Sequence, residues 1–152
     1  MAVSRTGEIE MDRSKVLFWY EEATVGNTYT WMDRFITYFD LEMRLIDKVG
    51  QFLDNQEPDR LPIAYPDLDS ALEDMSDHTW VFLDPNGDHI LDEFQHPEGL
   101  VVYAFGSNTT GFGQDLSGLG QLVKLRNPDE IYVLNALPLV LYDRELNLAG
   151  KR

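Results

Sequence analysis

The feature that most constrains the fold of this chain is an apolar segment that runs directly into a glycine-rich turn. Residues 100–105 (Leu-Val-Val-Tyr-Ala-Phe) are typical of a strand buried on both faces. Glycines follow at positions 106, 111 and 113, interleaved with Ser, Asn and Thr. Ligands of open α/β sheets bind beyond the carboxyl ends of strands. The turn is therefore a candidate ligand-binding loop, and the alternative is a surface loop without a ligand.

Length and composition narrow the class of protein. A chain of 152 residues with 43% hydrophobic residues forms a single domain with one core, and we expect a flexible arm over 1–15 and one domain over 16–152. The absence of cysteine excludes disulfides, thiolate chemistry and Cys-based zinc sites. No apolar run approaches the roughly 20 residues of a membrane helix, and the first residues lack the apolar core of a signal peptide. We expect a cytoplasmic location.

The net charge is unusual for a protein that binds nucleic acid. Acidic residues outnumber basic ones 27 to 12, which gives a formal net charge of −15. Phosphate binding normally uses a basic face, because counterion release drives it. Three explanations stay open: adaptation to high salt, a partner other than RNA, or a solubility device with a few clustered arginines.

Strands and helices alternate along the sequence. Apolar runs predict strands, and apolar residues at helical spacing, such as Trp31, Phe35, Tyr38 and Phe39, predict helices. The expected strands are Val16–Tyr20, Met43–Asp47, Thr79–Leu83, Gly99–Phe105 and Gln121–Leu125, and the expected helices are Thr28–Leu41, Asp67–Met75 and Asn135–Leu146. This alternation predicts an α/β fold with a mostly parallel sheet and helices on both faces.

The connections carry three further expectations. Residues 50–66 contain three prolines and predict an irregular connection. The Asn86-Gly87 pair is a strong hairpin signal. Pro138 is tolerated only in the first turn of a helix, so the last helix should begin near 135–137.

Two segments invite a metal-site interpretation that the residue pattern does not favour. The turn Asp84–Asp88 resembles the start of a calcium-binding loop, but His89 and Gln95 stand where such a loop needs Gly and Glu. His89, Asp92, Glu93 and His96 could be imagined as metal ligands. We expect a hairpin turn and a solvated loop instead, and no metal.

Three motifs together resemble those of the SpoU/TrmH branch of the SPOUT methyltransferases. Residues 105–112 read Phe-Gly-Ser-Asn-Thr-Thr-Gly-Phe, like the family's strand-turn motif. Val-Lys-Leu at 123–125 and Val-Leu-Asn at 133–135, before an apolar helix, are similar to the last motif. Asn27 and Arg34 follow the first strand, as in the first motif, although they are one residue further apart.

The resemblance implies a deep trefoil knot near the C-terminus, a homodimer and an S-adenosylmethionine cofactor. The implied activity is RNA methylation, and we expect a ribose 2′-hydroxyl of tRNA as its target. The resemblance assigns cofactor binding to Ala104, Phe105, Gly106, Asn108, Gly111, Val123, Leu125, Leu134 and Asn135. It assigns catalysis to Arg34, as the residue that activates the hydroxyl, together with Asn27.

Two departures from the motifs leave a second function open. Asn108 replaces the family's Glu, and Val133 replaces its Ser. Each lost donor or acceptor costs about 1–3 kcal/mol, or one to two decades in rate. A catalytically inactive SPOUT-like binding or assembly module, with a protein partner, is the main alternative. An unknotted flavodoxin-like binding domain is a third, and Arg34 could simply pair with Asp33 or Tyr38.

Overall fold

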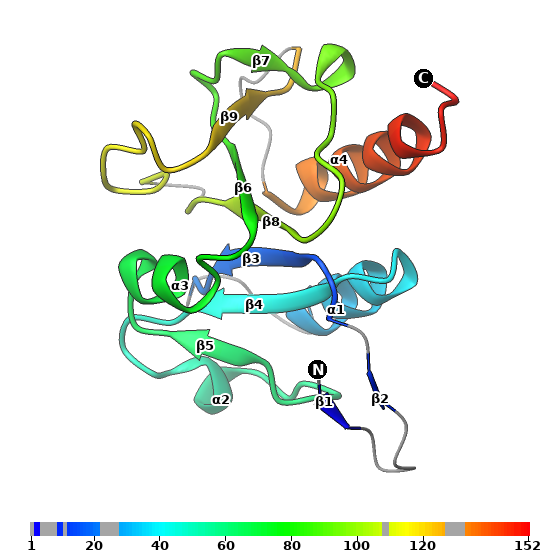
Figure 1. Ribbon diagram of the computed structural model, residues 1–152. Helices are drawn as coiled ribbons and strands as arrows, with labels where there is room; N and C mark the ends of the chain where they lie inside the picture. The colour runs from blue at the N-terminus through cyan, green and yellow to red at the C-terminus, as the bar shows by residue number, and fades with distance from the viewer. Residues whose placement is uncertain (1, 4–8, 11, 22–27, 108–109, 127–132) are drawn as a thin grey trace.

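Seven strands of the computed structural model form one sheet in which every pairing is parallel. The structure describes residues 2–3, 9–10, 12–21, 28–107, 110–126 and 133–152. The order across the sheet is β5-β4-β3-β8-β6-β9-β7 (Figure 1). These strands are β3 (Lys15–Trp19), β4 (Glu42–Ile46), β5 (Ile63–Tyr65), β6 (Thr79–Leu83), β7 (His89–Ile90), β8 (Val101–Phe105) and β9 (Gln121–Lys124). A separate antiparallel pair joins β1 (Ala2–Val3) and β2 (Ile9–Glu10).

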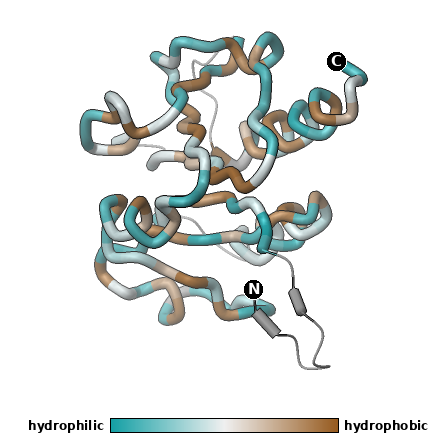
Figure 2. Tube along the Cα trace, in the orientation of Figure 1, coloured by the Kyte–Doolittle hydropathy of each residue, from teal (hydrophilic) through white to brown (hydrophobic). Residues whose placement is uncertain are grey.

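Helices cover both faces of the sheet, as the alternating pattern predicts. On one face lie α1 (Thr28–Tyr38), the short α2 (Phe52–Asn55), η1 (Leu91–Glu93) and α4 (Val133–Leu148). On the other face lies α3 (Leu68–Asp74), whose N-cap Asp67 accepts a hydrogen bond from Ser70 N at 2.8 Å. Figure 2 shows hydrophobic residues along the central strands between these layers. Among the described residues, no helix is long and apolar enough to span a membrane.

The central strand β8 is buried on both faces. Val101, Tyr103 and Phe105 face α1 and α4, while Val102 and Ala104 face α3. Each of these side chains is at most 2% exposed. Burying a side chain of the size of Val or Phe contributes about 1.5–3 kcal/mol. Because alternate residues of β8 pack on its two faces, the two cores meet on this strand.

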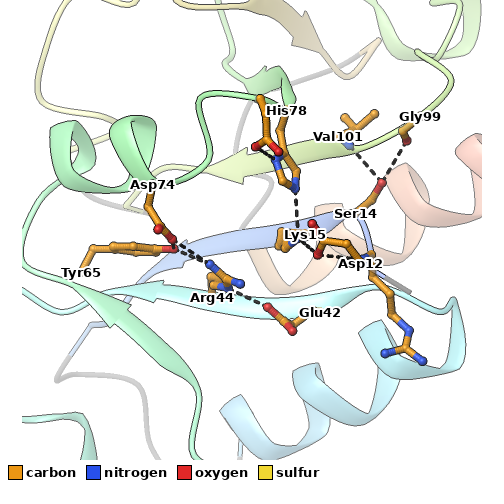
Figure 3. A network of polar contacts seen from close by, with 12 residues as sticks. Asp12, Ser14, Lys15, Glu42, Arg44, Tyr65, Asp74, His78, Gly99 and Val101 are labelled. Carbon is orange, nitrogen blue, oxygen red and sulfur yellow. Dashed lines mark hydrogen bonds and ion pairs between the residues drawn. The ribbon is translucent and has the colours of Figure 1, made fainter. Parts of the chain in front are cut away.

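Polar networks join the strands at the opposite edge of the sheet from the glycine turn (Figure 3). Lys15, at the start of β3, is almost completely buried, and its Nζ lies 2.5 Å from Asp12 Oδ1 and 2.9 Å from His78 Nε2. A lysine ammonium has no acceptor, so Nε2 of His78 must accept this bond. Ser14 Oγ donates to Gly99 O and accepts from Val101 N, which ties β3 to the start of β8.

The Asn86-Gly87 signal marks a turn, but the hairpin prediction is wrong. Asp84 O accepts a hydrogen bond from Gly87 N at 2.9 Å, so the turn itself forms. The strands that flank it, β6 and β7, do not pair, because β9 lies between them and is parallel to both. A strand from much later in the sequence therefore occupies the position that a hairpin partner would take.

The other differences lie at connections and helix ends. The segment 50–66 contains α2 (Phe52–Asn55) and β5 (Ile63–Tyr65), whereas its three prolines predicted an irregular connection. The last helix is already formed at Val133, so Pro138 lies in its second turn rather than its first. Helix α1 ends at Tyr38, shortly before Asp40, whose φ of 61° is left-handed.

The aromatic stripe that predicted α1 is largely not the buried face of the helix. Tyr29, Met32 and Ile36 pack into the core. Trp31 and Tyr38 are instead 62% and 82% exposed. The helix therefore carries an apolar face toward the sheet and a second, aromatic face toward solvent.

Candidate functional site

A cavity of about 570 Å³ lies at the carboxyl edge of the sheet. Its walls come from the end of β6 at Leu83, the end of β8 at Phe105, the end of β9 at Val123, and the first turn of α4 at Val133 and Ala136. This volume is within the usual range of small-molecule sites, about 300–1,000 Å³. The glycine-rich turn after β8 forms one side of the cavity, which makes this edge the candidate functional site.

A tight backbone contact shapes the glycine turn. Ser107 N donates to Gly111 O at 2.8 Å, and Gly111 N donates to Ser107 O at 2.9 Å. A Cβ on Gly106 would lie 2.7 Å from the carbonyl carbon of Gly111, and Gly111 has a φ of +62°. Residues other than glycine do not fit the first position and are strained at the second. The turn is therefore folded back on itself, with its backbone exposed to the cavity.

The turn after β6 forms another part of the cavity wall. Asp84 N donates to Val123 O at 2.9 Å, and Asp88 N donates to Leu122 O at 3.0 Å. A Cβ on Gly87 would meet the backbone carbon of Val123 at 2.7 Å. These contacts fix Asp84, Pro85 and Asn86 at the cavity. Sequence reasoning missed these three residues, because a local turn signal cannot reveal its contact with β9.

The structure brings together five of the nine residues expected to bind a cofactor. Those that line the cavity are Phe105, Gly106, Gly111, Val123 and Leu125.

The other four lie elsewhere or are only partly described. Ala104 is fully buried on the α3 face of β8. Asn135 is exposed in the first turn of α4 and does not line the cavity, and Leu134 lies beside it in the same turn. Asn108 is outside the described residues.

Arg34 does not line this cavity within one chain. It lies on the exposed side of α1, where its guanidinium packs 4.9 Å from the ring centre of Trp31. Its Nε and Nη2 donate to the two carboxylate oxygens of Asp59 at 2.8 and 3.3 Å. These bonds raise the pKa of Arg34 and lower the pKa of the Asp59 carboxyl. Arg34 therefore pairs with neither Asp33 nor Tyr38, and Asn27 is outside the described residues.

A polar cluster around the buried His96 lies away from the cavity. His96 is 1% exposed, with Nδ1 2.9 Å from Tyr103 Oη and Nε2 2.6 Å from Asp143 Oδ2. Arg152 Nε lies 2.8 Å from Asp143 Oδ1. The expectation of a solvated loop at His96 is wrong, since this residue anchors α4 to the segment after η1. Because His96 and Tyr103 are almost completely buried, we interpret these contacts as part of the packing between α4 and β8.

The side chains that the sequence analysis considered as metal ligands include Asp92 and Glu93 as well as His96. Among the described parts of the chain, no group of three or more His, Asp or Glu side chains is arranged to hold a metal ion. Asp92 is instead paired with Arg126, whose Nη2 lies 2.6 Å from Asp92 Oδ2.

Solved structures with the same fold include RNA methyltransferases. A structure described as giving insights into the 2-OH methylation of C/U34 on tRNA aligns with a TM-score of 0.67 at 19% identity, over 91% of this chain and 98% of that one. The SpoU methyltransferase AviRb from Streptomyces viridochromogenes, in complex with AdoMet, aligns with a TM-score of 0.65 at 15% identity, over 95% of this chain and 61% of that one.

A protein from Bacillus anthracis, provisionally described as an RNA methyltransferase, aligns with a TM-score of 0.65 at 13% identity, over 90% of this chain and 94% of that one. No protein-family profile matches the chain, and neither does any curated protein. The resemblance to SpoU/TrmH methyltransferases is confirmed as a likeness of fold.

The buried histidine predicts a pH dependence of stability. Burial lowers the pKa of His96 from its usual 6.5. On acidification, His96 is therefore protonated more readily in the unfolded chain than in the folded chain. The contribution to stability is fully present above about pH 6.5 and falls as the pH drops toward the lowered pKa. In urea unfolding, His96→Gln should show a smaller loss of stability below this pH than the unchanged protein. An equal dependence of the free energy of unfolding on pH in the two proteins would contradict the assignment. His78 and His89 are present in both proteins, so the comparison isolates His96.

Proposed function

We propose that this protein is an S-adenosylmethionine-dependent RNA methyltransferase that modifies a ribose 2′-hydroxyl, with tRNA as its substrate. One observation carries the proposal. A cavity walled by the glycine turn, the end of β9 and the first turn of α4 lies at the carboxyl edge of a sheet whose fold is shared with RNA methyltransferases. The residues that line the cavity support this proposal, and we propose a cytoplasmic location for the activity.

The residues present fit the methyl donor. Apolar walls from Phe105, Val123 and Leu125 suit an adenine ring, and the turn at Gly106 leaves no room for a Cβ, which brings bare backbone to the cavity. Asp84 adds a carboxylate to the lining. When bound, S-adenosylmethionine supplies a methyl group already activated by the sulfonium charge. The protein then has to bind the methyl donor, orient it toward the acceptor hydroxyl, and exclude water.

We extend the proposal to a homodimer built on α1 and α4. A groove of about 700 Å³ runs between these helices and η1, lined mainly by apolar side chains such as Phe35, Phe39 and Pro138. At its rim Leu139 and Tyr142 are 51% and 60% exposed. Exposed apolar surface of this kind marks an interface. A second copy on this face would cover Trp31 and bring Arg34 close to the subunit boundary.

Arg34 is proposed to act in a site that the second copy completes. In the single chain it stands outside the cavity, held at the surface of α1 by Asp59. An arginine beside a ribose hydroxyl stabilises the oxyanion that forms as the proton leaves. The trefoil knot is proposed on the likeness of fold alone, and the loops after β8 and β9 would form it.

A second function, an inactive binding or assembly module, is favoured by the charges. Arginines that a nucleic-acid surface would use are already paired with carboxylates. These pairs are Arg13 with Asp40, Arg34 with Asp59, Arg60 with Asp33, and Arg126 with Asp92. Val133 also lines the cavity at the position where the family motif has a hydroxyl. Exposed ion pairs are weak, so a polyanion can displace them, and measurement decides between the two functions.

Arg34→Ala should abolish methyl transfer to RNA without weakening cofactor binding. The unchanged protein is expected to bind S-adenosylhomocysteine in calorimetry, at low or at molar salt. The variant should bind it equally well and unfold at nearly the same urea concentration as the unchanged protein, since the Arg34–Asp59 pair is exposed and exposed pairs contribute little to stability. Arg13→Ala, which removes the same charge at another exposed pair, is the control. If Arg34→Ala still transfers methyl groups to RNA, Arg34 has no part in the mechanism. If the unchanged protein does not bind S-adenosylhomocysteine, the inactive binding or assembly module is favoured.

Tyr142→Glu should convert the dimer into a monomer in analytical ultracentrifugation. A carboxylate placed in an apolar interface has to be desolvated, and this costs several kcal/mol. Ile63→Glu adds the same charge at a residue that is 50% exposed, on the edge strand β5 and outside the groove lining, and it should leave the dimer intact. A monomeric unchanged protein, or a dimer insensitive to Tyr142→Glu, would refute the proposed interface.

A further inference from the structure

A short segment between α2 and β5 is held against one side of α1. This segment, which we call the strap, consists of residues 57–60, Glu-Pro-Asp-Arg. Its partners on the helix recur at helical spacing and are Thr30, Asp33, Arg34 and Thr37. Thr30 Oγ1 donates to Glu57 O at 3.4 Å, at the first residue of the strap. The strap therefore lies along the helix, beside Arg34.

One end of the strap is firmly attached. Arg60 Nη2 donates to Asp33 Oδ1 at 2.7 Å and to Thr37 Oγ1 at 2.6 Å, and Arg60 Nε donates to Asp33 Oδ2 at 3.3 Å. The Asp33 side chain is only 12% exposed. A buried carboxylate that loses its partner stays desolvated and uncompensated, so this pair resists displacement. Arg60 therefore anchors the strap to the helix.

The neighbouring ion pair of the strap is open to solvent. Arg34 Nε donates to Asp59 Oδ2 at 2.8 Å, and Nη2 donates to Asp59 Oδ1 at 3.3 Å. The two side chains are 52% and 50% exposed. Exposed pairs contribute little to stability and are screened by salt. Asp59 can therefore leave Arg34 while Arg60 keeps the strap in place.

The contact that Asp59 makes is one that a phosphate can also make. A guanidinium binds carboxylates and phosphates through the same paired N–H donors. The Arg34 guanidinium also lies over the ring of Trp31, 4.9 Å from its centre, which limits its orientations. Arg34 is thus preorganised for a phosphate, and Asp59 competes for the same donors. Such competition lowers the apparent affinity for the phosphate by the fraction of molecules in which Arg34 is available.

We infer that Arg34 is a phosphate-binding position for RNA and that Asp59 occupies this position in the free protein. The inference rests on the proposed function, because it takes RNA as the partner. It adds a competitor, Asp59, that lies in the connection between α2 and β5 and outside the three sequence motifs. A phosphate that displaces Asp59 would bring the adjoining ribose close to Arg34, as the proposed reaction needs. Removal of the Asp59 charge should therefore strengthen RNA binding beyond the effect of net charge.

Fluorescence anisotropy with a fluorescein-labelled tRNA transcript tests the inference through binding alone. At low salt, Asp59→Asn should bind the transcript about threefold more tightly than Asp40→Asn. Asp40→Asn is the matched control, because it removes the same charge from another exposed ion pair, with Arg13. Asn also tolerates the left-handed φ of 61° at this position. The advantage of Asp59→Asn should shrink as salt rises, and it should disappear when both substitutions are compared in Arg34→Ala.

Nuclear magnetic resonance of the ¹⁵N-labelled protein gives a second readout, the Nε–H signal of Arg34, assigned with Arg34→Lys. This signal should shift in Asp59→Asn and also when the transcript is added to the unchanged protein. The Nε–H signal of Arg60 should stay in place, because its pair with Asp33 persists.

Equal affinities of Asp59→Asn and Asp40→Asn, or an Arg34 signal that the transcript does not shift, would overturn the inference. If the transcript binds and either result is found, only the role of Asp59 and Arg34 in phosphate binding is rejected. If neither the unchanged protein nor any variant binds the transcript at low salt, both the inference and the proposed tRNA substrate are rejected.

Discussion

The candidate site depends on two places where backbones approach too closely for any side chain. At Gly106 the turn after β8 folds onto Gly111, and at Gly87 the turn after β6 lies against the backbone of β9. In both places a Cβ would lie 2.7 Å from a backbone carbon. These contacts fix two loops that line one cavity, and the parallel sheet places both loops at the same edge. Chemistry at this edge therefore depends on backbone shape before it depends on any single side chain.

How much the sequence could predict depended on whether the determining contacts were local. Strand β6 matches its expected bounds, and β3 differs by one residue at each end, because continuous apolar runs specify strands buried on both faces. The hairpin at Asn86-Gly87 failed because β9 enters between β6 and β7. Which strands pair is decided by the topology of the whole sheet, and a two-residue turn signal carries no information about that topology. The role of Asp84 at the cavity was hidden for the same reason.

Helix α1 shows how an amphipathic pattern can be ambiguous. Its aromatic residues recur at helical spacing, so the helix was predictable, but Trp31 and Tyr38 face solvent while Tyr29 and Ile36 face the core. Two apolar faces on one helix require two partners, and among the described residues only the face that carries Tyr29 and Ile36 packs into the core, while Trp31 and Tyr38 stay exposed. Sequence reasoning could assign the helix but not decide which face is buried, since burial depends on how the helix is rotated against the sheet.

The acidic charge and the fold favour different readings, and the arginine pairs connect them. Among the described residues, four exposed arginines, Arg13, Arg34, Arg60 and Arg126, are each paired with a neighbouring carboxylate. Rising salt weakens such exposed pairs and also the long-range repulsion between a protein of net charge −15 and RNA. A methyltransferase with this charge would therefore tolerate salt that inhibits a basic one.

Amide hydrogen exchange with and without S-adenosylhomocysteine tests the central claim, that the cavity between the glycine turn, β9 and α4 binds the methyl donor. The account predicts that the ligand slows exchange in segments 104–107, 122–125 and 133–137, and leaves α3 and β5 unchanged. These regions lie on different parts of the sheet, so the pattern is specific to the site. Unchanged exchange throughout, or protection confined to other segments, would contradict the account.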